Sequence, residues 1–171
     1  YTGIASGKFK YRKGRADPRI VAMRSPTKHV HDAISAATRE GAAEVGGTLF
    51  IRHRRAGIAS SGGALAEDES AALELSVRAF SQPEASGHAL CCTHKLSGLD
   101  ARMTGSRAGQ MAILAKDPVQ GEIGKTDLIL EPMFLGELMN STTMMLSAFL
   151  VEVGMSMFAK KIGKKVASEE V

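Results

Sequence analysis

The stretch from residue 71 to residue 95 places the strongest constraint on how this chain folds. Small or apolar side chains alternate with mostly polar ones, at Ala71, Leu73, Leu75, Val77 and Ala79. A period of two is typical of a strand that buries one face. Gln82-Pro83 interrupts the pattern, and residues 86–95 resume it. We therefore expect two strands of an antiparallel sheet.

The flanking segments predict helices and a further hairpin. Ser25-Pro26 is a good helix start, and Gly41 is a good stop. Residues 47–54 have the composition of a strand, and residues 57–60 resemble the start of its hairpin partner, with a glycine turn at 61–63. Asp100 can cap a helix that runs to Ala115. The predicted fold class is therefore α+β, an antiparallel sheet with flanking helices.

The C-terminal part has a different pattern. Residues 125–130 resemble a short buried strand, Pro132 opens a helical region, and a long helix is expected over residues 141–161. We expect an extended basic arm at residues 1–23, an α+β domain at 24–120, and the start of an incomplete second domain at 121–171. Because the first residue is Tyr1 rather than methionine, we expect a piece of a longer product.

Charge is distributed unevenly along the chain. Residues 1–55 carry 12 Lys/Arg and 4 Asp/Glu, whereas the overall formal net charge is only +4. The surplus lies in the first 19 residues and in the run Arg52–Arg55. Such runs attract phosphate or acidic partners. A nucleic-acid-associated regulator that uses the N-terminal arm is therefore one alternative function.

His88, Cys91, Cys92 and His94 have the chemistry of zinc ligands. On a strand, His88, Cys92 and His94 share one face, while Cys91 points to the other. Adjacent cysteines also lack the spacing of a structural zinc site. We expect a strand with buried cysteine and exposed histidine rather than a metal site, and an enzyme that uses His88 with the cysteine pair is a third hypothesis.

Compartment and nucleotide binding are constrained more weakly. The two cysteines do not form a disulfide framework, and the most apolar run, Met144–Val151, is shorter than the roughly 20 residues of a membrane span. A cytoplasmic location is the expectation. The run from Gly121 to Thr126 ends like a phosphate-binding loop, but its first glycine is missing and a strand is expected next. A turn that enters the strand is sufficient to explain it.

The order of several short sequence segments resembles that of the TldD/PmbA family, metallopeptidase-related proteins once labelled modulators of DNA gyrase. The segments are LSVRAF, EASGHALCC, LSGLD and GKTD within residues 75–127, followed by LSAFLVEVGMSMFAKKIGKKVASEEV at 146–171. The resemblance covers about residues 17–171. It implies that residues 24–120 form the family's N-terminal α+β domain and that residues 121–171 begin its C-terminal domain.

The resemblance also says where zinc would lie. Catalytic TldD-type members carry an HExxxH helix, in which two histidines bind zinc and the glutamate activates water. Laid on this sequence, those positions are Asn140, Ser141 and Met145, and HExxxH occurs nowhere in the chain. None of these three side chains supplies the required chemistry. We expect no catalytic residue, metal ligand or cofactor in this chain.

The resemblance therefore implies the PmbA, or TldE, type, which is the non-zinc partner subunit. Its implied partner is a TldD-like zinc subunit, or a second copy of itself. Its implied substrate is an unfolded peptide that the partner's zinc cuts inside a shared chamber. No membrane partner is expected, and binding of nucleic acid is the alternative rather than the first expectation.

Overall fold

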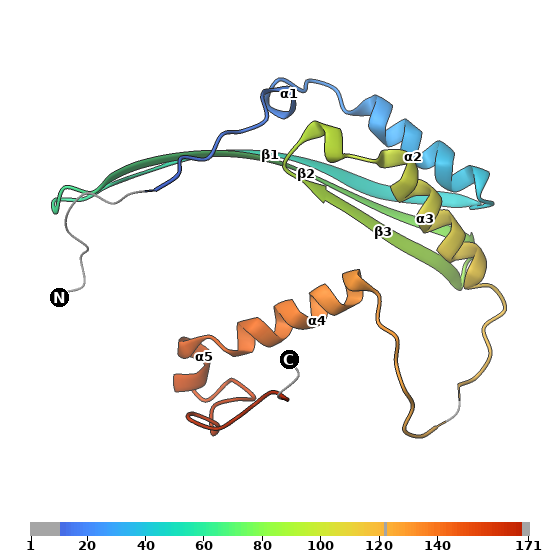
Figure 1. Ribbon diagram of the computed structural model, residues 1–171. Coiled ribbons are helices and arrows are strands. Elements are labelled where there is room, and N and C mark those ends of the chain that lie inside the picture. The colour runs from blue at the N-terminus through green and yellow to red at the C-terminus, as the bar shows by residue number, and fades with distance from the viewer. Residues whose placement is uncertain (1–10, 122, 169–171) are drawn as a thin grey trace. The chain divides into compact units, whose positions relative to one another are not determined.

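The computed structural model describes residues 11–121 and 123–168. The chain divides into two compact units, with the boundary between Gln120 and Gly121 (Figure 1). The first unit is α+β, as the sequence predicts, and contains a three-stranded antiparallel sheet in the order β1-β2-β3.

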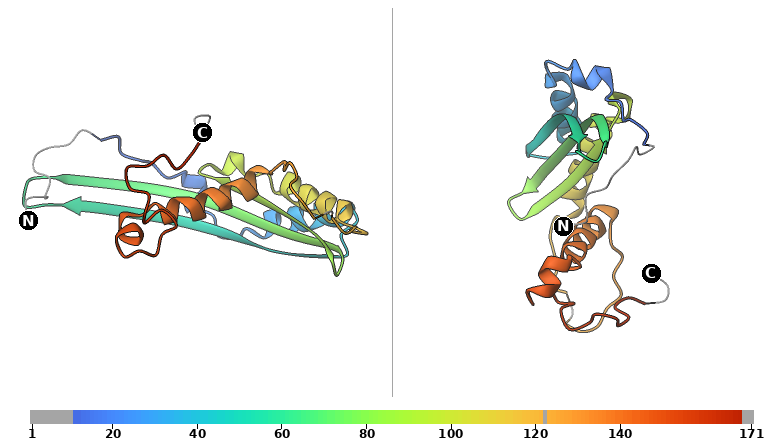
Figure 2. Two further views of the ribbon diagram at one scale, coloured as in Figure 1. Left: turned by 90° about the horizontal axis from the view of Figure 1, so that it is seen from below. Right: turned by 90° about the vertical axis from the view of Figure 1, so that its left-hand side faces the viewer.

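The sheet is a long hairpin joined by a shorter strand. It consists of β1 (Glu44–Ala59), β2 (Leu65–Gln82) and β3 (Ala85–Thr93). The alternating apolar residues of β2, from Ala71 to Ala79, are all buried, so the predicted face is confirmed. β3 pairs only with the second half of β2. The hairpin of β1 and β2 therefore extends beyond the end of β3 (Figure 2).

The partner of β1 differs from the sequence prediction. Residues 57–59 complete β1, and the returning strand starts at Leu65. The turn lies where the glycines indicated, and the Ser60 amide donates to the Ala64 carbonyl at 2.9 Å. β1 extends through its basic run because β2 places acidic residues opposite and diagonal to it: Arg52 contacts Glu74 at 3.0 Å.

Two helices, α2 (Thr27–Arg39) and α3 (Ala101–Leu114), cover one face of the sheet (Figure 1). Small residues bring them together. A Cβ on Gly105 would overlap the backbone of Ala33, and a Cβ on Gly87 in β3 would overlap the backbone of α3. The core is therefore built mainly from alanines and the apolar face of β2, with alanines at positions 33, 37, 42, 79, 89, 101, 108 and 112.

The helix ends follow the sequence in part. The Asp100 side chain accepts from the Met103 amide at 2.9 Å and caps α3, as predicted. Gly41 follows α2 with a φ of 104°, which only glycine adopts readily. Ser25 does not cap α2, because the helix begins at Thr27 and the two hydroxyls bond to each other at 2.8 Å.

The N-terminal arm needs a correction. The sequence indicated an extended segment over residues 1–23, of which residues 1–10 lie outside the described residues. Residues 18–21 form a short helix, α1 (Pro18–Val21), because Asp17 caps it and Pro18 occupies its first turn. Ile20 of α1 is fully buried, and it forms a second small core with Ala71 and Leu73.

The second unit contains α4 (Pro132–Met145) and α5 (Ala148–Glu152). The strand predicted at residues 125–130 is wrong: these residues form no strand, and Ile129 is fully exposed. No strand within the described residues pairs with them. The long helix predicted at 141–161 is also wrong, because Ser147 has a non-helical ψ of 128° and Gly154 has a φ of 76°.

Within residues 11–121 and 123–168, no helix is long and apolar enough to span a membrane.

Candidate functional site

The first candidate site lies on the face of the sheet opposite to α2 and α3. Here the polar positions of β2 meet the His/Cys residues that the sequence singled out. Arg52 of β1, Glu74 of β2 and Cys92 of β3 are adjacent across the strands, since Glu74 pairs with Cys92. A groove of about 230 Å³ runs between them, and it is lined by Arg52, Ala72, Leu73, Glu74, Cys92, Thr93 and His94.

Charge in this groove is largely paired. The Arg52 guanidinium lies 3.0 Å from the Glu74 carboxylate and 5.3 Å from the centre of the Phe50 ring. The expectation of a buried cysteine is wrong for Cys92, which is an exposed residue on the polar face of the sheet. Partial desolvation of its thiol still raises its pKa above the ordinary value, and the Glu74 carboxylate and Cys91 raise it further. Cys92 is therefore a neutral thiol at neutral pH and a poor nucleophile.

The two candidate histidines are engaged in different bonds. His94 Nδ1 donates to the Ala71 carbonyl at 3.1 Å. His88 Nε2 lies 2.8 Å from the Ser76 hydroxyl. Cys91 points to the other face, as predicted, and its Sγ lies 3.5 Å from the Gly98 carbonyl.

Among the residues that the structure describes, no group of three or more His, Cys, Asp and Glu is arranged to hold a metal ion. Cys92 and His94 share the groove, but His88 does not line it. The structure thus brings together only part of the candidate set. It does not bring Cys91 and Cys92 to one surface, which the hypothesis of a dithiol enzyme would require.

The second candidate site is the surface of α4. Asn140, Ser141 and Met145 all lie on this helix, and Asn140 and Ser141 are exposed. The neighbouring hydroxyls of Thr142 and Thr143 bond back to the carbonyls four residues earlier in the helix. A hydrolytic zinc ion needs nitrogen, thiolate or carboxylate ligands and an ionisable base. These residues do not fit zinc.

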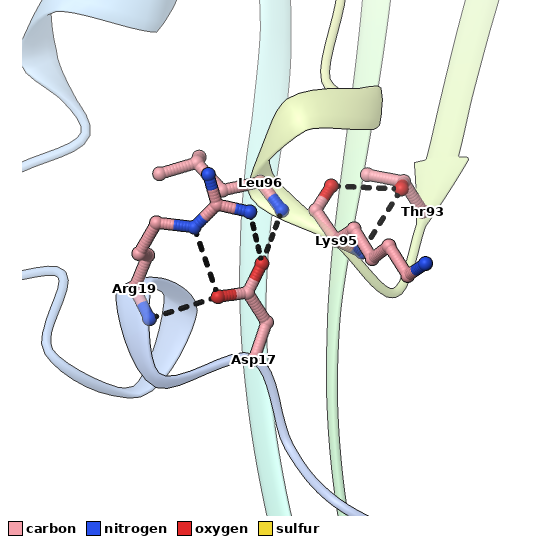
Figure 3. A network of polar contacts seen from close by, with 5 residues as sticks. All are labelled: Asp17, Arg19, Thr93, Lys95 and Leu96. Atoms are coloured by element: carbon pink, nitrogen blue, oxygen red, sulfur yellow. Dashed lines mark hydrogen bonds and ion pairs between the residues drawn. The ribbon is translucent and has the colours of Figure 1, made fainter.

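A third cluster, centred on Asp17, was missed by sequence reasoning. Its carboxylate accepts from the Arg19 amide at 2.9 Å and forms a two-point pair with the Arg19 guanidinium (Figure 3). It also accepts from the Leu96 amide at 2.9 Å, so it ties α1 to the segment after β3. The Arg19 hydrogen bond, with those from the two amides, holds the pKa of Asp17 far below its ordinary value. The partners are 79 residues apart, and no local pattern signals them.

The basic arm is held by acidic residues of β2. Lys13 contacts Glu67 at 3.0 Å, and the Gly14 amide donates to Asp68 at 2.7 Å. The Tyr11 hydroxyl accepts from the Glu67 amide at 2.8 Å, on the part of β2 that β3 does not cover. Lys13 lowers the pKa of Glu67. Part of the basic surplus is thus neutralised within the chain.

Comparison with known proteins identifies the second unit. Residues 123–171 match the family model described as the PmbA/TldA metallopeptidase C-terminal domain. This part of the chain is therefore similar to the C-terminal domain of the PmbA/TldD metallopeptidase family. The resemblance drawn from its sequence segments is confirmed.

One solved structure is similar to this chain in fold. It is described as a modulator of a DNA gyrase from Thermotoga maritima, with 17% sequence identity and a TM-score of 0.51. The match covers 64% of this chain and 27% of the solved one, so this chain spans about a quarter of that protein's length. A comparison with curated protein sequences gave no match.

Proposed function

We propose that this chain is part of a non-catalytic, PmbA/TldE-type subunit of a metallopeptidase system that acts on unfolded peptides. Its partner is a TldD-like subunit that carries zinc, or a second copy of the chain. The location that suits this role is the cytoplasm. The proposal combines the family segment at residues 123–171 with the chemistry of the side chains on α4.

The observation that carries the proposal is the absence of HExxxH from a chain with this family segment. Asn140 and Ser141 stand at the positions that correspond to the first ligand and the base. An amide is a poor zinc ligand, and a serine hydroxyl does not remain ionised at neutral pH as a carboxylate does. All five histidines of the chain lie between residues 29 and 94. Any zinc chemistry is therefore assigned to the partner.

The groove at Arg52 and Glu74 does not favour a competing catalytic role. Its acid is paired with arginine, and its thiol has a raised pKa. Binding of nucleic acid through the arm stays a prediction. The structure does not favour this role, because Lys13 is already paired with Glu67.

Co-expression with an HExxxH-bearing paralogue from the same source tests the proposal. We expect the two proteins to co-purify, and the complex to contain zinc and to hydrolyse an unstructured peptide. The paralogue expressed without this chain is the control for activity that needs no partner. Failure to co-purify with a paralogue or to self-associate would overturn the partner role. Stoichiometric zinc in this chain would overturn its non-catalytic assignment.

A further inference from the structure

The outer edge of β1 is a candidate interaction surface. β1 pairs with β2 on one side only, and no strand within the described residues lies along its other side. The strand is 16 residues long. Unpaired strand edges of this length readily accept a strand from another chain, unless charge, proline or a covering segment prevents it.

The register shows which backbone groups point outward. The Ser60 amide bonds the Ala64 carbonyl, and the same register continues along the hairpin, where Leu49 stands opposite Leu75. Hydrogen-bonded and non-hydrogen-bonded pairs alternate in an antiparallel ladder. The even-numbered residues of β1 therefore bond to β2. The odd-numbered residues from Val45 to His53 direct their amides and carbonyls to the outer edge.

Space is available along this edge. Gly46 and Gly47 are exposed, and Gly46 has no atom near the position that a Cβ would take. Thr48 and Phe50 are exposed as well. An incoming strand therefore meets little side-chain bulk at the start of β1.

The two ends of the β1 edge carry opposite charges, so the edge is complementary to the same edge of a second copy in the antiparallel orientation. In the basic run, Arg52 is paired with Glu74, and His53 Nε2 lies 2.8 Å from Glu69. Among the described residues, neither Arg54 nor Glu44 has an ion pair. One end of the edge thus offers an unpaired acid and the other an unpaired base.

We propose that β1 pairs with β1 of a second copy of this chain, antiparallel and about a two-fold axis at Leu49. In this register Glu44 of each copy stands opposite Arg54 of the other. Gly46 stands opposite Arg52, Gly47 opposite Ile51, and Leu49 opposite itself. The result is a continuous six-stranded sheet. The proposed function names a second copy of the chain as one of two partners, and this inference deepens it by assigning the surface that such a copy binds. If the pairing of β1 fails, the partner role with a TldD-like subunit is still tested separately by co-purification.

The register is self-consistent in two ways. The amide and carbonyl of Leu49 point to the outer edge of β1. A two-fold axis at Leu49 therefore places the outward-pointing amides and carbonyls of one copy opposite those of the other, as hydrogen-bonded pairs require. Directly opposite residues point to the same face, so each Glu44 carboxylate lies on the same face as the facing Arg54 guanidinium. Glycine opposite Arg52 leaves that side chain free to keep its pair with Glu74. The basic runs of the two copies do not overlap.

Sedimentation velocity of the whole chain over a concentration series tests the proposal. We expect a monomer–dimer equilibrium whose dissociation constant rises about tenfold in Glu44→Arg or in Arg54→Glu, because each change turns two opposite-charge pairs into like-charge pairs. The double variant Glu44→Arg/Arg54→Glu should restore dimerisation. Glu84→Arg is the matched control, since Glu84 is an exposed residue of the turn between β2 and β3.

Hydrogen exchange of the unmodified chain gives a second readout. On dimerisation, the amides of Gly47, Leu49 and Ile51 should become protected, while that of Glu84 should not change. A chain that stays monomeric, or a dimer with no added protection at these amides, would overturn the proposal. A dimer that is weakened by both single variants but not rescued by the double variant would overturn the register.

Discussion

The contact between Gly105 of α3 and the backbone of Ala33 in α2 gives a sharp test of the packing. In Gly105→Ala, the new Cβ overlaps the carbonyl of Ala33. Overpacking a well-packed core costs about 1–3 kcal/mol. Alanine recovers about 1 kcal/mol through its better helix propensity. Because the obstructing atoms are backbone and cannot rotate away, we take the upper part of the range and expect a net loss of about 1–2 kcal/mol.

Urea denaturation of the whole chain, followed by circular dichroism, measures this loss as a lower midpoint of the transition of the first unit. Gly136→Ala is the matched control, because Gly136 is also helical but a Cβ there would meet no atom within 4 Å. That variant should be no less stable than the parent chain. An unchanged or raised midpoint in Gly105→Ala would refute the close packing of α2 on α3.

Three further predictions concern titratable and polar groups. Asp17→Asn should lower the urea midpoint at neutral pH. Because the pKa of Asp17 in the folded chain lies below its ordinary 3.8, the parent chain loses this stabilisation in acid. The difference between the two midpoints should therefore shrink as the pH falls below about 4. Tyr11→Phe should speed hydrogen exchange of the Glu67 amide by about tenfold, through loss of its acceptor. In a Cys91→Ser background, Cys92 should react with iodoacetamide at pH 8 more slowly than it does in urea, because burial raises its pKa; equal rates would contradict this.

The sequence predicted the parts of the fold whose causes are local. Strict alternation from Ala71 to Ala79 was enough to define the buried face of β2, and Asp100 was enough to define the start of α3. In both cases the pattern and the partner lie within a few residues. The same is true of the turn at residues 60–64.

The features that the sequence did not predict depend on distant partners. Residues 125–130 have the composition of a buried strand, but no strand within the described residues pairs with them. The helix expected through residue 161 is interrupted at Ser147 and Gly154, where backbone conformation outweighs apolar composition. The bond between Asp17 and the Leu96 amide joins segments 79 residues apart. No motif signals a contact of that kind.

The candidate sites show the same division. The sequence placed His88, Cys92 and His94 on one face, but only the register shows that Cys92 stands opposite Glu74. For α4, the sequence alone shows that the zinc-binding residues are missing, because HExxxH is a local motif and its absence is visible in the sequence.

The central claim is that zinc chemistry belongs to the partner and not to this chain. The most direct measurement is peptide hydrolysis by the co-purified complex after the HExxxH glutamate of the paralogue is replaced by glutamine. The account predicts that hydrolysis is lost while the complex still forms. Hydrolysis that persists in this complex, and in this chain purified without the paralogue, would contradict it.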